Sequence, residues 1–392
     1  YYEKTIKYKE FLQMICSRNE CTGCGACFNI CPKGAITMLE NEYGFSYPEI
    51  DSKKCINCGL CKKSCPQLSL EKLNWHAPKE VYAMYSRNYA INKASTSGGM
   101  ARTFYENIIK LKGIAYGCNN INKDAKIEFI RVDKIEDLQL LQGSKYVQAN
   151  INDMFIQVKK DILNNRKVIF IGTPCQVAGL KAFLNKEYEN IFLIDIICHG
   201  VPSQKLLFED LQSNDIDISK ATKIIFREGK NYKIKVYDGA KEIFCQPANK
   251  NNYLINFLKG RISRESCYNC KFATSSRISD ITIGDYWGLD KRCKIANMKN
   301  DGISLVMINS NKGKELINIC KNEINIEKRN FEEASKENSQ LNYPTKENKE
   351  HITFLKMYPK YGYKKTMTKI EDIKDKIKKV EIINRIYLRI KK

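Results

Sequence analysis

The sequence predicts a small α+β module, then a larger α/β domain with a mainly parallel sheet, and finally a helical C-terminal tail. Two near-identical cysteine runs between Cys21 and Pro66 mark the first part. From Glu80 onward, short apolar runs alternate with helical segments, which is typical of an α/β domain. Apolar residues at helical spacing among lysines mark the tail. We therefore expect domains at residues 1–75 and 76–330, then a polar linker and a basic amphipathic helix at residues 331–392.

The two cysteine runs share one spacing. Both read C-x2-C-x2-C-x3-C-P, the spacing with which bacterial ferredoxins hold two 4Fe-4S clusters. The fourth cysteine of each run ligates the cluster of the other run. The sequence therefore predicts an α+β ferredoxin-like module, and a disulfide framework is disfavoured. The expected ligands of the first cluster are Cys21, Cys24, Cys27 and Cys65. Those of the second cluster are Cys55, Cys58, Cys61 and Cys31.

Cysteine usage and the lack of an apolar leader favour a reducing compartment. The 392 residues contain 17 cysteines, and the opening segment has no apolar signal core. No run reaches the roughly 18 apolar residues that a spanning helix needs. We expect a cytoplasmic protein whose cysteines bind metal, since reducing conditions keep thiols available as ligands.

The net charge of +22 would, on its own, suit a nucleic-acid partner. Nucleic acid is disfavoured, because the lysines are spread along the chain and form no stripe interleaved with aromatic residues. Positive charge near the clusters would offset their negative charge and would attract acidic redox partners. We therefore expect a redox partner protein such as ferredoxin, and a homo-oligomer is left open.

The α/β domain begins with elements whose chemistry is ambiguous. A Ser-Gly turn within Ser95–Tyr105 opens a helix, and its backbone amides could hold a phosphate or simply cap that helix. In Leu141–Gln148, Gly143 suits a helix C-terminus, and Lys145 and Tyr146 offer a cation and a ring beside a bound cofactor, unless this is an ordinary loop. The other expected elements are strands at Val81–Tyr85, Gly113–Cys118 and Ile127–Val132 and helices at Lys134–Leu141 and Ile151–Asn164.

Two consecutive strand-turn-helix units follow. The strands Val168–Ile171 and Ile191–Ile197 are apolar almost throughout, as in a parallel sheet that is covered on both faces. Each strand leads into a turn that holds a cysteine, Cys175 in the first unit and Cys198 in the second. Ligands bind at the carboxyl ends of parallel strands, and neighbouring strands lie about 5 Å apart. Adjacent strands would therefore bring both thiols close enough for one cluster.

A C-Y-N-C motif supplies two more cysteines, Cys267 and Cys270. A single C-x2-C motif is ambiguous between a zinc site, a redox pair and half of a cluster site. Together with Cys175 and Cys198 it makes a set of four thiols. Spacing cannot separate a 4Fe-4S cluster from zinc here, although the clusters of the first module favour iron-sulfur. The cysteines expected to be core residues are Cys118, Cys245, Cys293 and Cys320.

The remaining segments carry weaker signals. The segment Thr222–Cys245 predicts three β-rich pieces with a hairpin turn at Asp238-Gly239. Asp285, in a G-D-Y-W-G turn, could orient a cofactor or cap its loop. His199 could ligate metal or relay a proton, but a loop histidine without a chemical role is favoured. The basic tail helix could contact a membrane surface peripherally or pack on its own domain, and packing is favoured.

In order and together, the motifs of this chain resemble those of the coenzyme F-420 hydrogenase/dehydrogenase beta subunit family, in the form that carries an N-terminal two-cluster ferredoxin. The likeness extends from about Cys21 to Pro359. Each motif is weak alone, but the set is specific. The motifs are S-G-G-M (Ser97–Met100), G-S-K-Y-V (Gly143–Val147), G-T-P-C-Q (Gly172–Gln176), C-H-G (Cys198–Gly200), C-Y-N-C-K-F (Cys267–Phe272), S-D-I-T-I-G-D (Ser279–Asp285) and G-I-S-L-V (Gly302–Val306).

This resemblance implies an iron-sulfur flavoprotein. Members of the family bind FAD, and the matching residues here are Ser97, Gly98, Gly99, Gly143, Ser144, Lys145, Tyr146 and Thr173. Members also hold a 4Fe-4S cluster near the flavin, through cysteines that match Cys175, Cys198, Cys267 and Cys270. A flavin can exchange a hydride as well as single electrons, which a cluster alone cannot do.

The resemblance does not give the substrate. Archaeal members act on the deazaflavin coenzyme F-420, related plant and cyanobacterial enzymes reduce chlorophyll-type substrates, and many bacterial members lie in surface-polysaccharide gene sets. We expect an oxidoreductase that passes electrons between a soluble ferredoxin-type carrier, the clusters and FAD, with a small-molecule two-electron substrate such as coenzyme F-420. The alternative is a non-catalytic electron-relay subunit of a larger redox complex. No catalytic residue is assigned.

Overall fold

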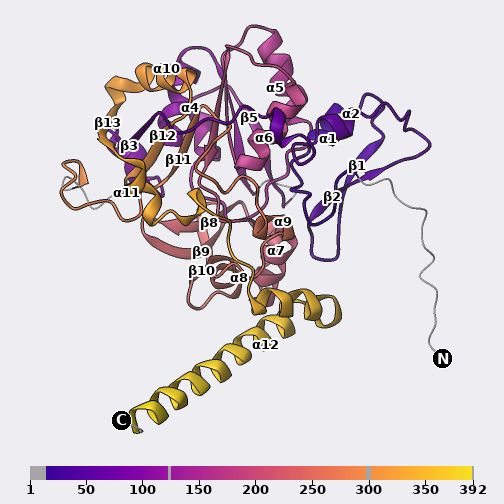
Figure 1. Ribbon diagram of the computed structural model, residues 1–392, viewed down its shortest axis with the longest axis vertical. Helices are drawn as coiled ribbons and strands as arrows, with labels where there is room; N and C mark the ends of the chain where they lie inside the picture. Colours follow the sequence, from indigo (N-terminus) through magenta and orange to yellow (C-terminus); the bar gives the residue numbers. More distant parts are fainter. Residues whose placement is uncertain (1–14, 122–124, 297–301, 391–392) are drawn as a thin grey trace.

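The computed structural model describes residues 15–121, 125–296 and 302–390, and side chains as far as residue 371. A small N-terminal module is followed by a large α/β domain and then by C-terminal helices (Figure 1). This is the order that the sequence predicts. Within the described residues, no helix combines the length and the apolar character needed to cross a membrane.

The N-terminal module consists of two short helices and one hairpin. Its helices are α1 (Ala26–Ile30) and α2 (Leu60–Lys63), and its antiparallel strands are β1 (Ile36–Glu40) and β2 (Ser46–Ile50). Gly25 and Gly59 precede the two helices with φ of 77° and 72°. This left-handed conformation is readily adopted by glycine alone, and it lets the chain turn tightly from a cysteine loop into each helix.

The large domain is built on an eight-stranded sheet of order β13-β3-β12-β11-β7-β6-β4-β5. Strands β11, β7, β6 and β4 run parallel and form its centre, whereas the flanking pairs are antiparallel. The expected parallel arrangement therefore holds for the core of the sheet. The strands are β3 (Glu80–Ser86), β4 (Ile114–Ile121), β5 (Ile127–Val132), β6 (Val168–Gly172), β7 (Ile191–Ile196), β11 (Ile281–Asp285), β12 (Ser304–Ile308) and β13 (Ile324–Arg329).

Helices bury both faces of this sheet. In β6, Val168 and Phe170 pack with residues of α5 and α6, whereas Ile169 and Ile171 pack with residues of α4 and α10. Side chains alternate between the two faces of a strand, so a strand covered on both faces is apolar at every position. The covering helices are α4 (Met100–Lys110), α5 (Met154–Leu163), α6 (Pro174–Leu184), α7 (Gln204–Ser213) and α10 (Asn311–Cys320).

A separate sheet of three antiparallel strands lies at the lower edge of the domain in Figure 1. Its strands are β8 (Lys223–Glu228), β9 (Asn231–Asp238) and β10 (Lys241–Pro247), as the β-rich pieces and the hairpin turn predicted. Cys245 lies on β10, an edge strand, and is exposed, so its expected place in the core was wrong. Short helices elsewhere in the domain are α3 (Tyr89–Lys93), which lies against β3, α8 (Asn252–Leu258), which lies against β9, and α9 (Glu265–Tyr268).

The C-terminal helices are α11 (Phe331–Lys336) and α12 (Lys349–Ile390), and α12 is broken at Gly362. Phe354, Tyr358, Tyr363 and Met367 are buried in the main core. The first half of α12 therefore packs on its own domain, which is the favoured expectation. The side chains of residues 372–390 lie outside those that the structure describes.

One predicted helix differs in type. The segment Glu136–Leu141 is a 3₁₀-helix. In a 3₁₀-helix, residues three apart point the same way, and Leu138 and Leu141 are both buried in the core. Further 3₁₀ turns are Leu70–Lys72, Ile218–Lys220, Lys321–Glu323 and Ser339–Leu341.

Candidate cluster and cofactor site

One group of cysteines lies in the interior of the N-terminal module. Cys21, Cys24, Cys27 and Cys65 are all buried. Burial raises the pKa of the Cys27 thiol well above its ordinary value, and negative charge on the other three thiols raises it further. The four thiols therefore lie close together. They are the set expected for the first cluster.

A second group lies at the surface of the module. Cys58 is exposed, and Cys55, Cys61 and Cys31 are partly exposed. Burial raises the pKa of Cys61, and Cys55 and Cys58 add to this rise. Cys31 and Cys61 pack against the same small apolar cluster. These four cysteines are the set expected for the second cluster.

Cys16 is a neighbour of the first group that the sequence did not single out. Its thiol lies near those of Cys21 and Cys65, around one small cavity. Interaction with Cys16 lowers the pKa of both neighbours, to about 6 for Cys21. Cys16 stands outside both cysteine runs, so no spacing rule could reveal this contact.

Four further cysteines gather at the carboxyl edge of the large sheet. Strands β6 and β7 are adjacent and parallel, which confirms the predicted arrangement. Cys175 lies in the first turn of α6, after β6, and Cys198 follows β7. Burial raises the pKa of Cys198, and charge on Cys267, Cys175 and Cys270 raises it further. The structure thus brings together the third cysteine set, Cys175, Cys198, Cys267 and Cys270.

The chemistry of the third cysteine set suits a metal centre. Burial raises the pKa of Cys175 to about 11 and that of Cys267 to about 12. Such thiols stay protonated at neutral pH unless a cation favours the thiolate, and a bound metal does this directly. In the described parts of the chain, however, no three His, Cys, Asp or Glu side chains are placed to hold a single metal ion, so the fit rests on the chemistry of the four thiols and not on a preformed single-ion geometry.

The third cysteine set lies directly against the first group. Charge on Cys175 contributes to the raised pKa of Cys24, after burial as the main cause. Gly179, one helical turn beyond Cys175, makes the approach close. A Cβ atom placed on Gly179 would lie 2.9 Å from the Sγ atom of Cys24. Helix α6 therefore connects the two cysteine groups.

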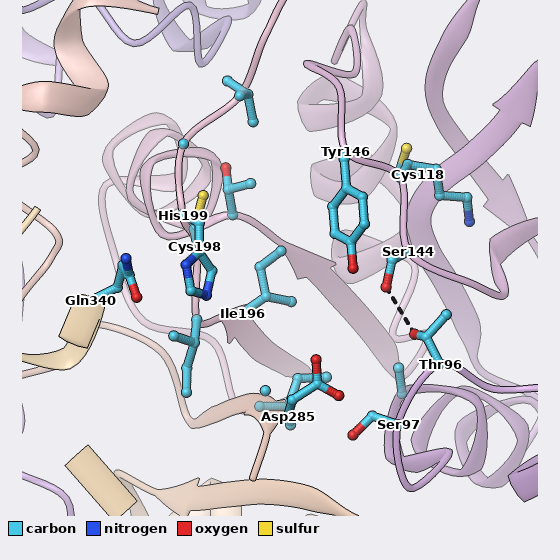
Figure 2. Close-up of a pocket in the computed structure, with 18 of the residues that line it drawn as sticks. Thr96, Ser97, Cys118, Ser144, Tyr146, Ile196, Cys198, His199, Asp285 and Gln340 are labelled. Atoms are coloured by element: carbon cyan, nitrogen blue, oxygen red, sulfur yellow. Dashed lines mark hydrogen bonds between the residues drawn. The ribbon is translucent and has the colours of Figure 1, made fainter. Parts of the chain in front are cut away.

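A cavity of about 1040 Å³ opens beside the third cysteine set, with Cys175 and Cys198 in its lining. Figure 2 shows Ser97, Ser144 and Tyr146 on one side of this cavity and His199 and Cys198 on the other. The hydroxyl groups of Thr96 and Ser144 are hydrogen-bonded at 2.8 Å and join two of the loops. The expected flavin residues that line the cavity are Ser97, Gly99, Gly143, Ser144, Lys145, Tyr146 and Thr173.

Gly98 supports the cavity wall from behind. A Cβ atom there would lie 2.4 Å from the carbonyl oxygen of Met84 and 2.7 Å from the amide nitrogen of Ser304. Gly99 is the N-cap of α4, with φ of 80° and no capping side chain. The first backbone amides of α4 are therefore left for an anion, which the positive end of the helix favours.

Comparison with known proteins identifies two parts of the chain. Residues 165–334 match the model of the C terminus of the coenzyme F420 hydrogenase/dehydrogenase beta subunit. Residues 165–334 are thus similar to the C-terminal domain of this family. Two models of the 4Fe-4S dicluster domain match residues 20–68 and 47–121. The first of these spans all eight cysteines of the two runs, so the N-terminal module is a two-cluster iron-sulfur domain.

A solved structure shows a further likeness. A chain of the xenon-derivatised F420-reducing NiFe hydrogenase complex from Methanosarcina barkeri is 17% identical. The alignment covers 76% of this chain and 92% of that chain, with a TM-score of 0.46. No curated protein sequence matches the chain.

Arg264 joins the first cysteine group to the third cysteine set. Its side chain is fully buried. Its guanidinium donates to the carbonyl oxygens of Cys21 at 2.6 Å and Ser46 at 3.0 Å, and it lies 4.1 Å from the ring centroid of Tyr47. Its charge also opposes the effect of burial on the pKa of Cys175.

Lys145 and Tyr146 form one wall of the cavity. The ammonium group of Lys145 donates to the carbonyl oxygen of Gln142 at 3.0 Å. Burial lowers the pKa of Lys145 to about 8. Tyr146 stacks on Phe257, with ring centroids 5.0 Å apart. Cys118 is partly buried against the main core and also lines the cavity, whereas Cys293 and Cys320 are fully buried.

The opposite wall holds Asp285, His199 and an arginine that the sequence did not indicate. Arg227, on β8, donates to Asp285 at 2.5 Å and lies 5.3 Å from the ring centroid of Trp287. Asp285 thus joins the two sheets by an ion pair, rather than capping its own loop. Burial lowers the pKa of His199, and Asp285 opposes this effect.

The segment between α11 and α12 also lines the cavity, through Asn338, Gln340 and Tyr343 among others. Gln340 is seen beside His199 in Figure 2. From the sequence, this polar stretch was expected to be a linker. Its polar composition gives no sign that it lines the cavity. Only the tertiary fold brings this segment back to the edge of the large sheet.

Proposed function

We propose that this iron-sulfur protein is a flavin-dependent oxidoreductase. In this proposal, FAD lies in the cavity and the third cysteine set holds a 4Fe-4S cluster. Electrons pass between a soluble ferredoxin-type carrier and a two-electron substrate, for which coenzyme F-420 is the candidate. The family match supports the general class, hydrogenase or dehydrogenase, and the dicluster match supports electron transfer through the N-terminal module.

One observation carries the proposal. The same cavity of about 1040 Å³ is lined by Cys175, Cys198 and the loops that the resemblance assigns to FAD. A site for a two-electron cofactor thus adjoins a set of four thiols. That set in turn lies against the first cysteine group. Because each site adjoins the next, electrons have a continuous route between the N-terminal module and the cavity, through the third cysteine set.

The residues present fit both groups. FAD bound there would supply hydride exchange and single-electron exchange. The uncapped amides of α4 and the ammonium group of Lys145 would bind its diphosphate, and Tyr146 offers an aromatic face. His199, kept neutral by burial, could hold or release a proton at a ring nitrogen beside the reacting substrate.

The test is reduction of the bound flavin followed by hydride transfer. The anaerobically purified chain is mixed with reduced methyl viologen and then with oxidised coenzyme F-420. We expect the flavin absorbance to bleach and to return as coenzyme F-420 is reduced in equal amount. A non-catalytic relay subunit, the alternative, would oxidise the viologen to the capacity of its clusters and would leave coenzyme F-420 unchanged.

A further inference from the structure

The two cysteine groups of the N-terminal module differ in their access to solvent. Cys21, Cys24, Cys27 and Cys65 are buried, whereas Cys58 is exposed. The buried group adjoins the third cysteine set, and the exposed group forms the outer end of the module. Electron transfer weakens steeply with distance, so a protein that exchanges electrons with this chain gains most by binding over the exposed group.

The chain around Cys58 is strongly basic. The segment Lys53–Lys63 contains four lysines and no acidic residue. Lys53, Lys54, Lys62 and Lys63 are all exposed. In the described parts of the chain, Lys54 forms an ion pair with Asp51 at 3.7 Å, and both side chains are well exposed. The positive charge of the segment therefore faces solvent largely unbalanced.

Apolar side chains lie between the two lysine pairs of this segment. Ile56 and Leu60 flank Cys58 in the chain and are 57% and 37% exposed. Protein interfaces commonly have such an apolar centre, depleted of charge, within a polar rim. Exposed apolar residues beside an electron-transfer centre are suited to brief contact with a partner, and electron-transfer complexes are among the smallest interfaces.

We propose that the surface of Lys53–Lys63, here called the carrier face, binds a small acidic one-electron carrier protein of the ferredoxin type. Binding of the carrier does not depend on the proposed function. Only the later path of the electron, from the N-terminal module to FAD, rests on that proposed function. The carrier gives up or takes one electron in each encounter, and no bond forms or breaks. Charge complementarity selects an acidic partner, because the lysine rim accelerates encounter with a negative surface.

A different interpretation assigns the lysines to the cluster itself, whose negative charge they would offset. The two interpretations differ in what charge reversal changes. Loss of an internal counter-charge alters the reduction potential of the cluster with any reductant. Loss of a docking rim alters encounter with an acidic protein and its dependence on salt.

The experiment compares two charge-reversed pairs with a matched control. The test variants are Lys62→Glu with Lys63→Glu, and Lys53→Glu with Lys54→Glu. The control is Lys321→Glu with Lys328→Glu, which reverses two exposed lysines at the far edge of the large sheet, at or beside β13. The probe is a small acidic two-iron ferredoxin. Its oxidation by the full-length, cluster-loaded chain is followed by stopped flow at several ionic strengths, and its binding in the oxidised state by calorimetry.

At low salt, we expect each test variant to bind the probe about tenfold more weakly than the unchanged chain does, and to oxidise it about tenfold more slowly. The salt dependence should also become flatter. The control should behave like the unchanged chain. Reduced methyl viologen is a small cation that needs no basic docking surface, so it should react with the test variants no more slowly than with the unchanged chain.

Unchanged rate, affinity and salt dependence in both test variants would overturn the proposal, provided that their iron content is normal. An equal loss in the control would also overturn it, because the effect would then reflect net charge. A shifted cluster potential with unchanged probe affinity would support the internal counter-charge instead. Oxidation of the probe requires no flavin, so this result is separable from failure of the proposed function.

Discussion

Arg264 lies at the contact between the first cysteine group and the third cysteine set. It donates to the carbonyl oxygen of Cys21 from a fully buried position. Its peptide oxygen accepts from the amide of Cys267, and its own amide donates to Val201. The backbone of Arg264 therefore helps to hold Cys267 of the third cysteine set, and its charge lies between that set and the first cysteine group. A fixed cation at this position favours the more negative, reduced state of a neighbouring cluster.

Replacing Arg264 by Met should lower a cluster potential. We expect a shift of roughly 60 mV, equivalent to a tenfold change in the equilibrium of a one-electron couple. The measurement is a redox titration of the purified chain followed by electron paramagnetic resonance. Arg264→Lys keeps the charge and should leave the potential close to that of the unchanged chain. Identical potentials in all three proteins, at equal iron content, would show that Arg264 acts only as a packing residue.

In the proposed flavin site, Lys145 should make flavin binding depend on pH. Burial lowers its pKa from 10.5 to about 8, and a bound diphosphate favours its charged form. Affinity for FAD should therefore be highest below pH 8 and should fall by up to about tenfold per pH unit above it. Fluorescence titration between pH 6.5 and 9.5 measures this. Lys145→Gln should bind FAD more weakly and without this slope; a slope that persists would assign the titration to another group.

Without flavin, the lowered pKa of Lys145 affects the free energy of unfolding, and this effect has the opposite dependence on pH. The folded Lys145 loses its proton near pH 8, whereas an unfolded lysine keeps it to about pH 10.4. The unfolded state thus binds more protons within this window. The contribution of Lys145 to the free energy of unfolding therefore rises with pH between these two values.

Among single residues, the sequence identifies those ligands whose spacing along the chain is fixed by the group that they bind. The ferredoxin cysteines are recognisable because one cluster fixes the distance between its ligands along the chain. Arg264 and Arg227 are not recognisable in this way. Each acts on groups far away in the chain, and its neighbours in sequence carry no sign of that contact.

Helix α6 depends on a glycine where it passes the first cysteine group. Gly179→Ala should raise the helical propensity of α6 by about 1 kcal/mol. It would also place a Cβ atom 2.9 Å from the Sγ atom of Cys24. We therefore expect a chain that folds normally but loses iron from the first cluster, measured as iron per chain beside the thermal unfolding midpoint. Full iron content in this variant would show that Cys24 can move without loss of the cluster.

Among the elements, the parallel core was predictable and the flanks of the sheet were not. Strands β6 and β7 are followed by similar cysteine turns, and their continuous apolar character indicates burial on both faces. The antiparallel pairs, including β13 beside β3, depend on which distant segments meet. The β13 segment, with its polar alternate positions, resembles an exposed loop until β3 is known to lie beside it.

The whole molecule places its cysteine groups in a sequence from surface to cavity. The exposed group lies at the outer end of the N-terminal module, the buried group lies beneath it, and the third cysteine set lies where the module meets the large domain. Tyr43 helps to fix this contact, since its hydroxyl donates to the carbonyl oxygen of Leu355 at 2.7 Å and its ring stacks on Tyr358. The C-terminal helix thus holds the module against the large domain, which the sequence could not indicate.

Analysis of metal and flavin in the anaerobically purified chain tests the central claim most directly. The claim is that a third cluster and FAD share one cavity. It predicts about 12 iron atoms and one FAD per chain, falling to about 8 iron atoms in Cys198→Ser with the two clusters of the N-terminal module intact. About 8 iron atoms in the unchanged chain, with tightly bound zinc or without flavin, would contradict it.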